Sequence, residues 1–247
     1  MLDQGLDQAA GLRRMVAAQA PTMNLMAFPV ALGGDGAWIA TLAHSLRAMG
    51  MRPVVLDASR GTVTRAFGMK PRHELLDMMR GAMTFDEVAH ATADGVYVLR
   101  AERGVEAFVS SGAPARQLFS GFAQLSHGFD SVLLAMPAGE LACMAPPADA
   151  VPVVVLDDNA DGMVRAYGTV KQLALGFGYT RFALVARGAS EGSKAQHSRL
   201  AAAARTFLNA EVTLAGRLPG TDLNAAPVMA QLARTLLHTA TTPLVLH

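Results

Sequence analysis

The 247-residue sequence predicts one three-layer α/β domain, a mainly parallel sheet with helices on both faces, preceded by a short helical extension. Two observations indicate this class. From residue 24 onward, apolar runs of strand length alternate with helical patterns, as in repeated strand–helix units. The runs are apolar throughout, which is typical of strands that are buried on both faces. We therefore divide the chain into an extension, residues 1–20, and an α/β domain, residues 21–247.

The extension has the pattern of an amphipathic helix. Five apolar side chains recur there at helical spacing: Leu2, Leu6, Ala9, Leu12 and Val16. Gly11 lies among them and costs about 1 kcal/mol against alanine, and isolated helices this short are marginal in water. We expect the helix to become stable on a partner. Pro21 separates it from the domain.

The domain alternates strands and helices in the order that a parallel sheet requires. The expected strands are 25–30, 53–57, 96–99, 131–135, 151–156, 182–186 and 212–218. The expected helices are 38–49, 73–80, 85–90, 116–126, 162–175, 191–208 and 226–238. Residues 142–152, which contain three prolines, are expected to form a loop. Ligands of such sheets bind at the carboxyl ends of the strands, where the glycine turn 31–38, Asp57 and Ala135 map.

The turn 31–38 reads A-L-G-G-D-G-A-W and has the frame of a phosphate-binding loop, G-x-x-x-x-G-K-[ST]. The glycines that permit a tight turn remain at Gly33, Gly34 and Gly36. The first glycine, the lysine and the hydroxyl residue are replaced by Ala31, Ala37 and Trp38. Asp35 adds a negative charge where a phosphate would lie. The loop thus keeps its shape and loses the groups that bind phosphate and Mg²⁺.

Composition narrows the function classes. Basic and acidic residues number 21 and 20, a net charge of +1, so no nucleic-acid partner is expected. The single cysteine, Cys143, excludes an internal disulfide and fits a reducing compartment. No signal-peptide pattern and no run of about 18 apolar residues is present, and the tail 239–247 lacks the basic amphipathic pattern of a membrane-surface helix. We expect a cytoplasmic protein without membrane association.

Three stretches resemble known motifs. Residues 52–61, R-P-V-V-L-D-A-S-R-G, and residues 129–139, F-D-S-V-L-L-A-M-P-A-G, resemble the second-strand and Walker B motifs of the MinD/ParA class of deviant P-loop ATPases. The order of segments resembles that class over nearly the whole domain. Residues 7–13, D-Q-A-A-G-L-R, match D-Q-A-x-x-L-R, the activator motif of the FlhG/FleN subfamily, which controls flagellar number and placement. The resemblance implies a P-loop NTPase fold of MinD type.

The resemblance also identifies positions at which an ATPase site has been lost. The two lysines of the family's loop match Leu32 and Ala37, and its threonine or serine matches Trp38. The acid that aligns water matches Ser59, the Walker B acid matches Ala135, and the adenine-contacting asparagine after strand 182–186 is also missing, since Ala186, Arg187 and Gly188 stand there. Phosphoryl transfer depends on positioning and on cations, so these losses predict a pseudo-ATPase that has lost ATP and Mg²⁺ binding and has no cofactor.

Two side chains of this degenerate site receive specific interpretations. The Trp38 indole is large enough to fill the space of the metal and the β-phosphate. Asp57, the acid that remains, is interpreted as a strand-end acid that caps nearby backbone or bridges to a surface base rather than as a catalytic group, because its partners in the family's mechanism are absent.

For the extension, the resemblance implies a role in GTPase activation. Within the motif Asp7, Gln8, Ala9, Leu12 and Arg13, Leu12 would be an apolar anchor and Arg13 a polar clamp on FlhF, a GTPase of the signal-recognition type. Gln8 would help to order the water that attacks GTP, as the glutamine of other GTPases does. The domain surface would contact flagellar switch (C-ring) proteins or a flagellar transcription activator.

Three alternatives remain. One is a residual MinD/ParA-type ATPase that controls flagellar placement, and another is a nucleotide-independent MinD-like scaffold for cellulose synthesis or partitioning. The third is a serine hydrolase, because residues 188–192 fit G-x-S-x-G around Ser190 and are followed by Asp222 and His238. Only one weak strand follows Ser190, and His238 falls in a predicted helix, which argues against a triad. The histidines lack metal-ligand spacing, and Met49, Met78, Met79 and Met136 are expected in the core.

Overall fold

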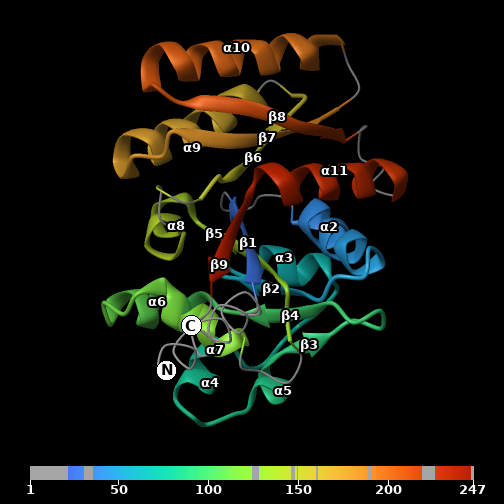
Figure 1. The fold of residues 1–247 in the computed structure, drawn as a ribbon, viewed down its shortest axis with the longest axis vertical. Coiled ribbons are helices and arrows are strands. Elements are labelled where there is room, and N and C mark those ends of the chain that lie inside the picture. The colour runs from blue at the N-terminus through green and yellow to red at the C-terminus, as the bar shows by residue number, and fades with distance from the viewer. Residues whose placement is uncertain are drawn as a thin grey trace, which may run out of the picture.

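The computed structural model forms a central sheet with helices on both faces (Figure 1). It describes residues 22–30, 36–123, 128–145, 148, 150–159, 161–188, 191–218 and 226–245. The strands are β1 (Thr22–Pro29), β2 (Pro53–Asp57), β3 (His90–Ala91), β4 (Tyr97–Arg100), β5 (Ser131–Met136), β6 (Val153–Asp157), β7 (Arg181–Arg187), β8 (Glu211–Leu218) and β9 (Thr241–Val245). The helices are α2 (Ala37–Ala48), α3 (Thr62–Ala66), α4 (Leu75–Met79), α5 (Phe85–Val88), α6 (Glu102–Ser110), α7 (Ala115–Ala123), α8 (Ala138–Met144), α9 (Gly162–Phe177), α10 (Glu191–Leu208) and α11 (Ala226–Thr239).

The strands form two hydrogen-bonded groups. Six follow the order β3-β4-β2-β5-β1-β9 and three the order β6-β7-β8, with β6 beside β1. All described pairs are parallel except β1 with β9 and β3 with β4. The α/β class and the mainly parallel sheet predicted from the sequence are therefore confirmed.

Both faces of the sheet are buried, because successive strand residues belong to two different hydrophobic clusters. In β1, Leu25 and Ala27 pack in one cluster, while Met26 and Phe28 pack in the other. The first cluster lies under helices that include α7, α9 and α10, and the second under α2 and α11. Every residue of β2 and of β5 is buried. This two-sided burial explains why the strands read as continuous apolar runs.

Several segments differ from the sequence-based expectation. α6 was not expected, and α8 ends inside the segment predicted as a loop. The tail contributes β9, which pairs antiparallel with β1 from Thr22↔Val245 to Met26↔Thr241. Met136 is buried as expected, but Met49 and Met79 are 37% and 40% exposed, so their assignment to the core was wrong.

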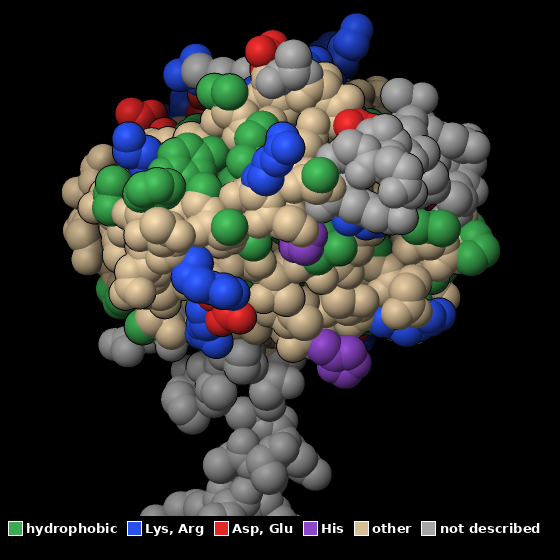
Figure 2. Space-filling model, turned by 90° about the horizontal axis from the view of Figure 1, so that it is seen from above, with side chains coloured by type: hydrophobic (Ala, Val, Ile, Leu, Met, Phe, Trp, Pro, Cys, Tyr) green, Lys and Arg blue, Asp and Glu red, His purple; other side chains and the backbone are tan. Residues whose placement is uncertain are grey.

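The upper layer of the molecule exposes apolar side chains at one end. Leu175, Phe177 and Phe207 are 64%, 36% and 72% exposed, and they lie near the ends of α9 and α10. The segments that follow the two helices are neighbours, because the N–H of Glu211 donates to the carbonyl of Thr180 at 2.7 Å. Figure 2 shows hydrophobic side chains gathered on the left, the side on which both helices end in Figure 1.

Candidate functional site

The carboxyl ends of three parallel strands meet at one edge and bring the predicted site residues together. Ala135 on β5 lies in register with Phe28 on β1 and with Asp57 on β2. The N–H of Ala58 donates to the carbonyl of Ala135 at 2.8 Å, which carries the sheet one residue past Asp57. The expectation that the turn, Asp57 and Ala135 share this edge is confirmed for the residues that the structure describes, Gly36 included.

Asp57 is fully buried and caps the turn that leads into α3. Its Oδ1 accepts hydrogen bonds from the N–H of Ser59 at 3.0 Å and from the Ser59 hydroxyl at 2.5 Å. Its Oδ2 accepts from the N–H and from the hydroxyl of Thr64, both at 2.6 Å. An ionised carboxylate has about four acceptor sites, so these donors use its capacity. The hydrogen bonds favour the interpretation of Asp57 as a backbone cap.

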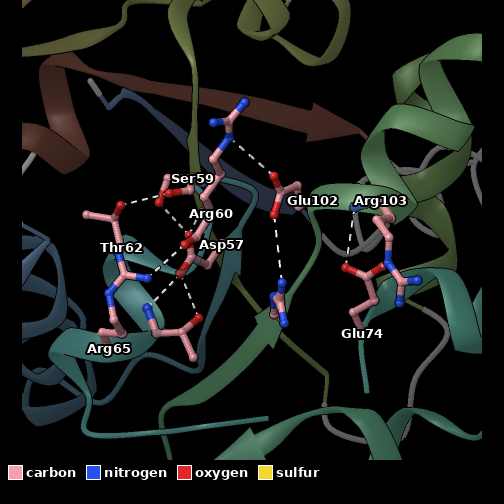
Figure 3. A network of polar contacts seen from close by, with 10 residues as sticks. Asp57, Ser59, Arg60, Thr62, Arg65, Glu74, Glu102 and Arg103 are labelled. Atoms are coloured by element: carbon pink, nitrogen blue, oxygen red, sulfur yellow. Dashed lines mark hydrogen bonds and ion pairs between the residues drawn. The ribbon is translucent and has the colours of Figure 1, made fainter. Parts of the chain in front are cut away.

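Ser59 turns its hydroxyl inward, toward the carboxylate of Asp57. The side chain is 4% exposed and donates to Asp57, while the hydroxyl of Thr62 donates to the carbonyl of Ser59 at 2.7 Å. Figure 3 shows the three side chains in one cluster at the start of α3. The position that resembles the family's water-aligning acid therefore serves the local structure of the turn. Sequence reasoning missed Thr64, although a threonine seven residues after a strand-end acid carries no signal of its own.

Gly36 holds the end of the glycine turn against α3. It is buried, and a Cβ built on it would lie 2.7 Å from the carbonyl oxygen of Thr62 and 2.8 Å from Cα of Val63. Real Cβ atoms do not approach backbone so closely, so this site requires glycine. The close contact between the start of α2 and α3 thus explains the glycine at position 36 without a bound phosphate.

Trp38 is a core side chain at the start of α2. It is 3% exposed, and its ring meets Phe28 edge-on with centroids 5.3 Å apart and an interplanar angle of 77°. It belongs to the hydrophobic cluster under α2 and α11. Ala37 precedes it as the first residue of the helix. The indole is thus anchored in the core, and its place relative to a bound metal stays a prediction.

A chain of charged side chains borders the site on the side of β4 and α6 (Figure 3). Arg60, in the left-handed region with φ 57°, places Nε 3.5 Å from Oε1 of Glu102, and Nη2 of Arg100 lies 3.8 Å from Oε2 of the same carboxylate. Arg65 donates from Nη1 to the carbonyl of Arg60 at 2.9 Å. Arg60 is therefore engaged by Glu102, and its exposed pair contributes about 0–1 kcal/mol.

A second polar cluster closes the edge at β6 and β7. Nε of Arg187 lies 3.1 Å from Oδ1 of Asp157, and Nη2 of Arg165 lies 3.2 Å from Oδ2. Arg187 and Asp157 are also partners in the strand register. Gly188 follows with φ 123°, and a Cβ there would lie 2.2 Å from Cβ of Asp158. The segment that would contact adenine in the family is thus packed against charged side chains of the chain itself.

Some of the predicted residues lie outside the described part of the chain. They are Asp7, Gln8, Ala9, Leu12 and Arg13 of the motif, Leu32, Gly33, Gly34 and Asp35 of the turn, and Ser190 and Asp222 of the hydrolase alternative. His238 lies inside α11. Across the described residues, no group of three or more His, Cys, Asp or Glu side chains could hold a metal ion. No described helix is long and apolar enough to cross a membrane.

Several solved structures share this arrangement of strands and helices. MinD from Aquifex aeolicus superposes with a TM-score of 0.61 over 87% of this chain and 96% of its own, at 13% identity. This chain has the MinD fold. MinD from Pyrococcus horikoshii, solved with Mg-ADP, gives a TM-score of 0.57 over 87% of this chain and 96% of its own, at 16% identity. An ATP complex of McdA from Cyanothece gives 0.55 over 87% of this chain and 95% of its own, at 11% identity.

The MinD fold confirms the three-layer architecture expected from the sequence. No family model matches the chain, and no curated protein matches it. At these identities the likeness concerns the fold alone, so function rests on the residues of the site and on the motif.

Proposed function

We propose that this chain is a non-catalytic regulator of flagellar biosynthesis and number that binds an FlhF-type GTPase through residues 7–13 and stimulates it. One contrast carries the proposal. At the strand edge of a MinD fold, both carboxylate oxygens of Asp57 accept hydrogen bonds from the turn and the start of α3, and the side chain of Ala135 is only a methyl group. The activator motif D-Q-A-x-x-L-R is complete in the same chain.

The hydrogen bonds of the edge support the proposed loss of ATP chemistry. Mg²⁺ takes oxygen ligands in near-octahedral geometry. Asp57 could supply one only by giving up a donor such as Thr64, and that donor would then lie buried without a partner. Ala135, Ala37 and Trp38 supply no oxygen or cation from their side chains. These side chains therefore offer few ligands to Mg-ATP, and the α/β domain has a structural role in the proposed regulator.

Activation of the GTPase rests on the chemistry of Gln8. Its amide can donate to one oxygen and accept from water at the same time, which suits a residue that orients an attacking water. Ala9 and Leu12 lie on the apolar side of the predicted helix and would anchor it in a groove of the GTPase. Asp7 and Arg13 would add charged contacts that fix its register.

The test is the GTP turnover of purified FlhF-type GTPase with the full-length chain added. Stimulation is expected, and Gln8→Ala should lower it by about tenfold or more, because the water loses its orienting group. The matched control is Gln4→Ala, which removes the same side chain from the same segment outside the motif and should retain stimulation. Equal turnover with and without the chain, or full activity of Gln8→Ala, refutes the proposal.

The residual-ATPase alternative is separated by calorimetry with Mg-ATP. We expect no heat of binding at micromolar concentrations of nucleotide, and micromolar affinity would favour the alternative. The scaffold alternative is separated in cells. It predicts that deletion of residues 1–20 leaves flagellation unchanged, whereas the proposal predicts an altered number of flagella. Contacts with C-ring proteins or a transcription activator would use the domain surface and would survive this deletion.

A further inference from the structure

A groove of about 530 Å³ runs between α2 and α11, on the face of the sheet opposite α9 and α10. Small and flexible apolar side chains line it, among them Ala48, Met49, Ala226, Met229 and Ala230. Its volume lies in the range of about 300–1,000 Å³ that is typical of ligand sites in proteins. Met49 is 37% exposed in this groove, and methionine adapts its shape to a partner.

Alanines on both helices allow another helix to approach closely. Ala48 and Ala226 are exposed and Ala230 is half-buried, so the groove has low walls of methyl groups. Such a surface fits an amphipathic helix that inserts apolar side chains at positions three and four residues apart. Extended chains would instead need an open sheet edge, which this surface of two helices does not offer.

The charge of the groove favours an acidic helix. Its lining includes Arg234, whose Nη1 donates to Oε1 of Gln231 at 3.1 Å, and His44, whose Nδ1 lies 2.7 Å from Oδ2 of Asp94. Because His44 already pairs with Asp94, Arg234 is the cation of the groove lining that can bind an incoming carboxylate, through its remaining N–H groups.

The chain carries a segment of this kind at its own start. Residues 2–13 place the apolar side chains of Leu2, Leu6, Ala9 and Leu12 beside two acidic residues, Asp3 and Asp7, and one basic residue, Arg13, so this part of the chain is acidic. Acidic residues near the N-terminus of a helix also favour the helical state. The segment therefore matches the groove in shape and in charge.

The segment can reach the groove. Asn24 on β1 and Pro53 on β2 both pair with Ser131, so the two strands begin at the same level, two strand spacings or roughly 10 Å apart. Met49, at the end of α2, comes four residues before Pro53, which places the α2 end of the groove at that same edge. A docked helix over residues 2–13 leaves the eight residues 14–21 as the connection to β1, and these span at most about 26 Å when extended.

We propose that the groove between α2 and α11 binds residues 2–13 of the same chain as an amphipathic helix, with residues 14–21 as the connection to β1. Docking buries Ala9 and Leu12, the apolar residues of the activator motif, and so withholds Gln8 from the GTPase. The inhibition of GTPase stimulation rests on the proposed function, whereas the docking itself does not. Stimulation then requires the segment to leave the groove, which makes the chain self-inhibited.

Cross-linking of the full-length chain tests the docking. In a Cys143→Ser background, Leu6→Cys combined with Ala230→Cys should form an intramolecular disulfide under mild oxidation. The matched control combines Leu6→Cys with Ala202→Cys, an exposed alanine of α10 on the opposite face of the sheet, and should stay reduced. Equal yields in both pairs, or disulfides between two chains only, overturn the proposal.

A larger side chain in the groove tests whether docking inhibits GTPase stimulation. Ala230→Phe should displace the segment, and if it is docked in about nine molecules of ten, the concentration for half-maximal GTPase stimulation falls about tenfold. Ala202→Phe is the control and should leave that concentration unchanged. An unchanged value in Ala230→Phe, with stimulation intact, refutes self-inhibition and leaves the proposed function standing. A cross-link without any GTPase stimulation keeps the docking and refutes the proposed function.

Discussion

Thr64 holds the Asp57 carboxylate with two hydrogen bonds, since its N–H and its hydroxyl both donate to Oδ2 at 2.6 Å. The pair joins the end of β2 to the first turn of α3. Ser59 completes the cap from the other carboxylate oxygen. The acid thus serves the stability of the site, and its removal should act on folding before it acts on any ligand.

Asp57→Asn should destabilise the chain by about 2–3 kcal/mol, because hydrogen bonds to a buried charged group are worth about 1.5–3 kcal/mol each. The amide NH₂ replaces an acceptor and leaves one of the donors of Ser59 or Thr64 buried without a partner. Urea unfolding measures the loss. Asp161→Asn is the matched control, since this carboxylate is 84% exposed and lies 4.0 Å from Arg165. Its effect should stay within about 0.5 kcal/mol, and an equally small effect at Asp57 contradicts the capping role.

Gly36→Ala should destabilise the chain by about 1–3 kcal/mol, which is the usual cost of overpacking. The new methyl group would lie 2.7 Å from the carbonyl oxygen of Thr62 and push α2 away from α3. Thermal unfolding followed by circular dichroism measures the change.

Gly168→Ala provides the opposite case for the same substitution. Gly168 lies in the interior of α9, is exposed, and has no atom within 4 Å of a built Cβ. Alanine there should stabilise the chain by roughly 0.5–1 kcal/mol, because it loses less backbone entropy than glycine. Equal effects at the two positions would show that the contact between Gly36 and Thr62 is loose.

The parts of the fold that sequence could predict are those fixed by local pattern. β2 and β5 are apolar on both faces and were placed within a residue of their bounds. α6 was missed because Gly104 weakens its helical pattern, and the reason for that glycine is non-local, since a Cβ there would lie 2.6 Å from Cβ of Leu75. β9 was missed for a similar reason, because its hydrogen bonds depend on β1, which comes from the opposite end of the domain sequence.

The candidate site shows the same limit. The positions at which this chain departs from the family's motifs are visible in the sequence itself. A non-catalytic role for Asp57 could also be predicted, because its catalytic partners are absent. The donors that satisfy it, Ser59 and Thr64, and the pairing of Arg60 with Glu102 depend on how α3 and α6 pack beside β2. Side-chain types alone do not define such packing.

His197 should make stability depend on pH. Burial in α10 lowers its pKa below the ordinary 6.5, and the positive charge of Arg217 lowers it further. Below pH 6.5 the unfolded chain therefore binds a proton that the folded chain resists, so the free energy of unfolding falls as the pH drops from about 6.5 toward 5. Urea unfolding at a series of pH values measures this slope. His197→Asn should flatten this slope. The control His238→Asn leaves His197 and Arg217 in place, so the part of the slope that His197 contributes should remain.

Phe207 should drive weak self-association through the apolar end of α9 and α10. It is 72% exposed, and Phe177 and Leu175 add apolar surface at the same end of the two helices. Exposed apolar side chains gathered at one end of a molecule favour contact between proteins. Phe207→Lys should lower the apparent mass measured by light scattering at high concentration. Its free energy of unfolding should stay within about 0.5 kcal/mol, because the ring is exposed and a cation suits the last turn of a helix. Phe207→Leu keeps the surface apolar and should associate like the unmodified chain; equal masses for all three proteins would show that this surface is inert.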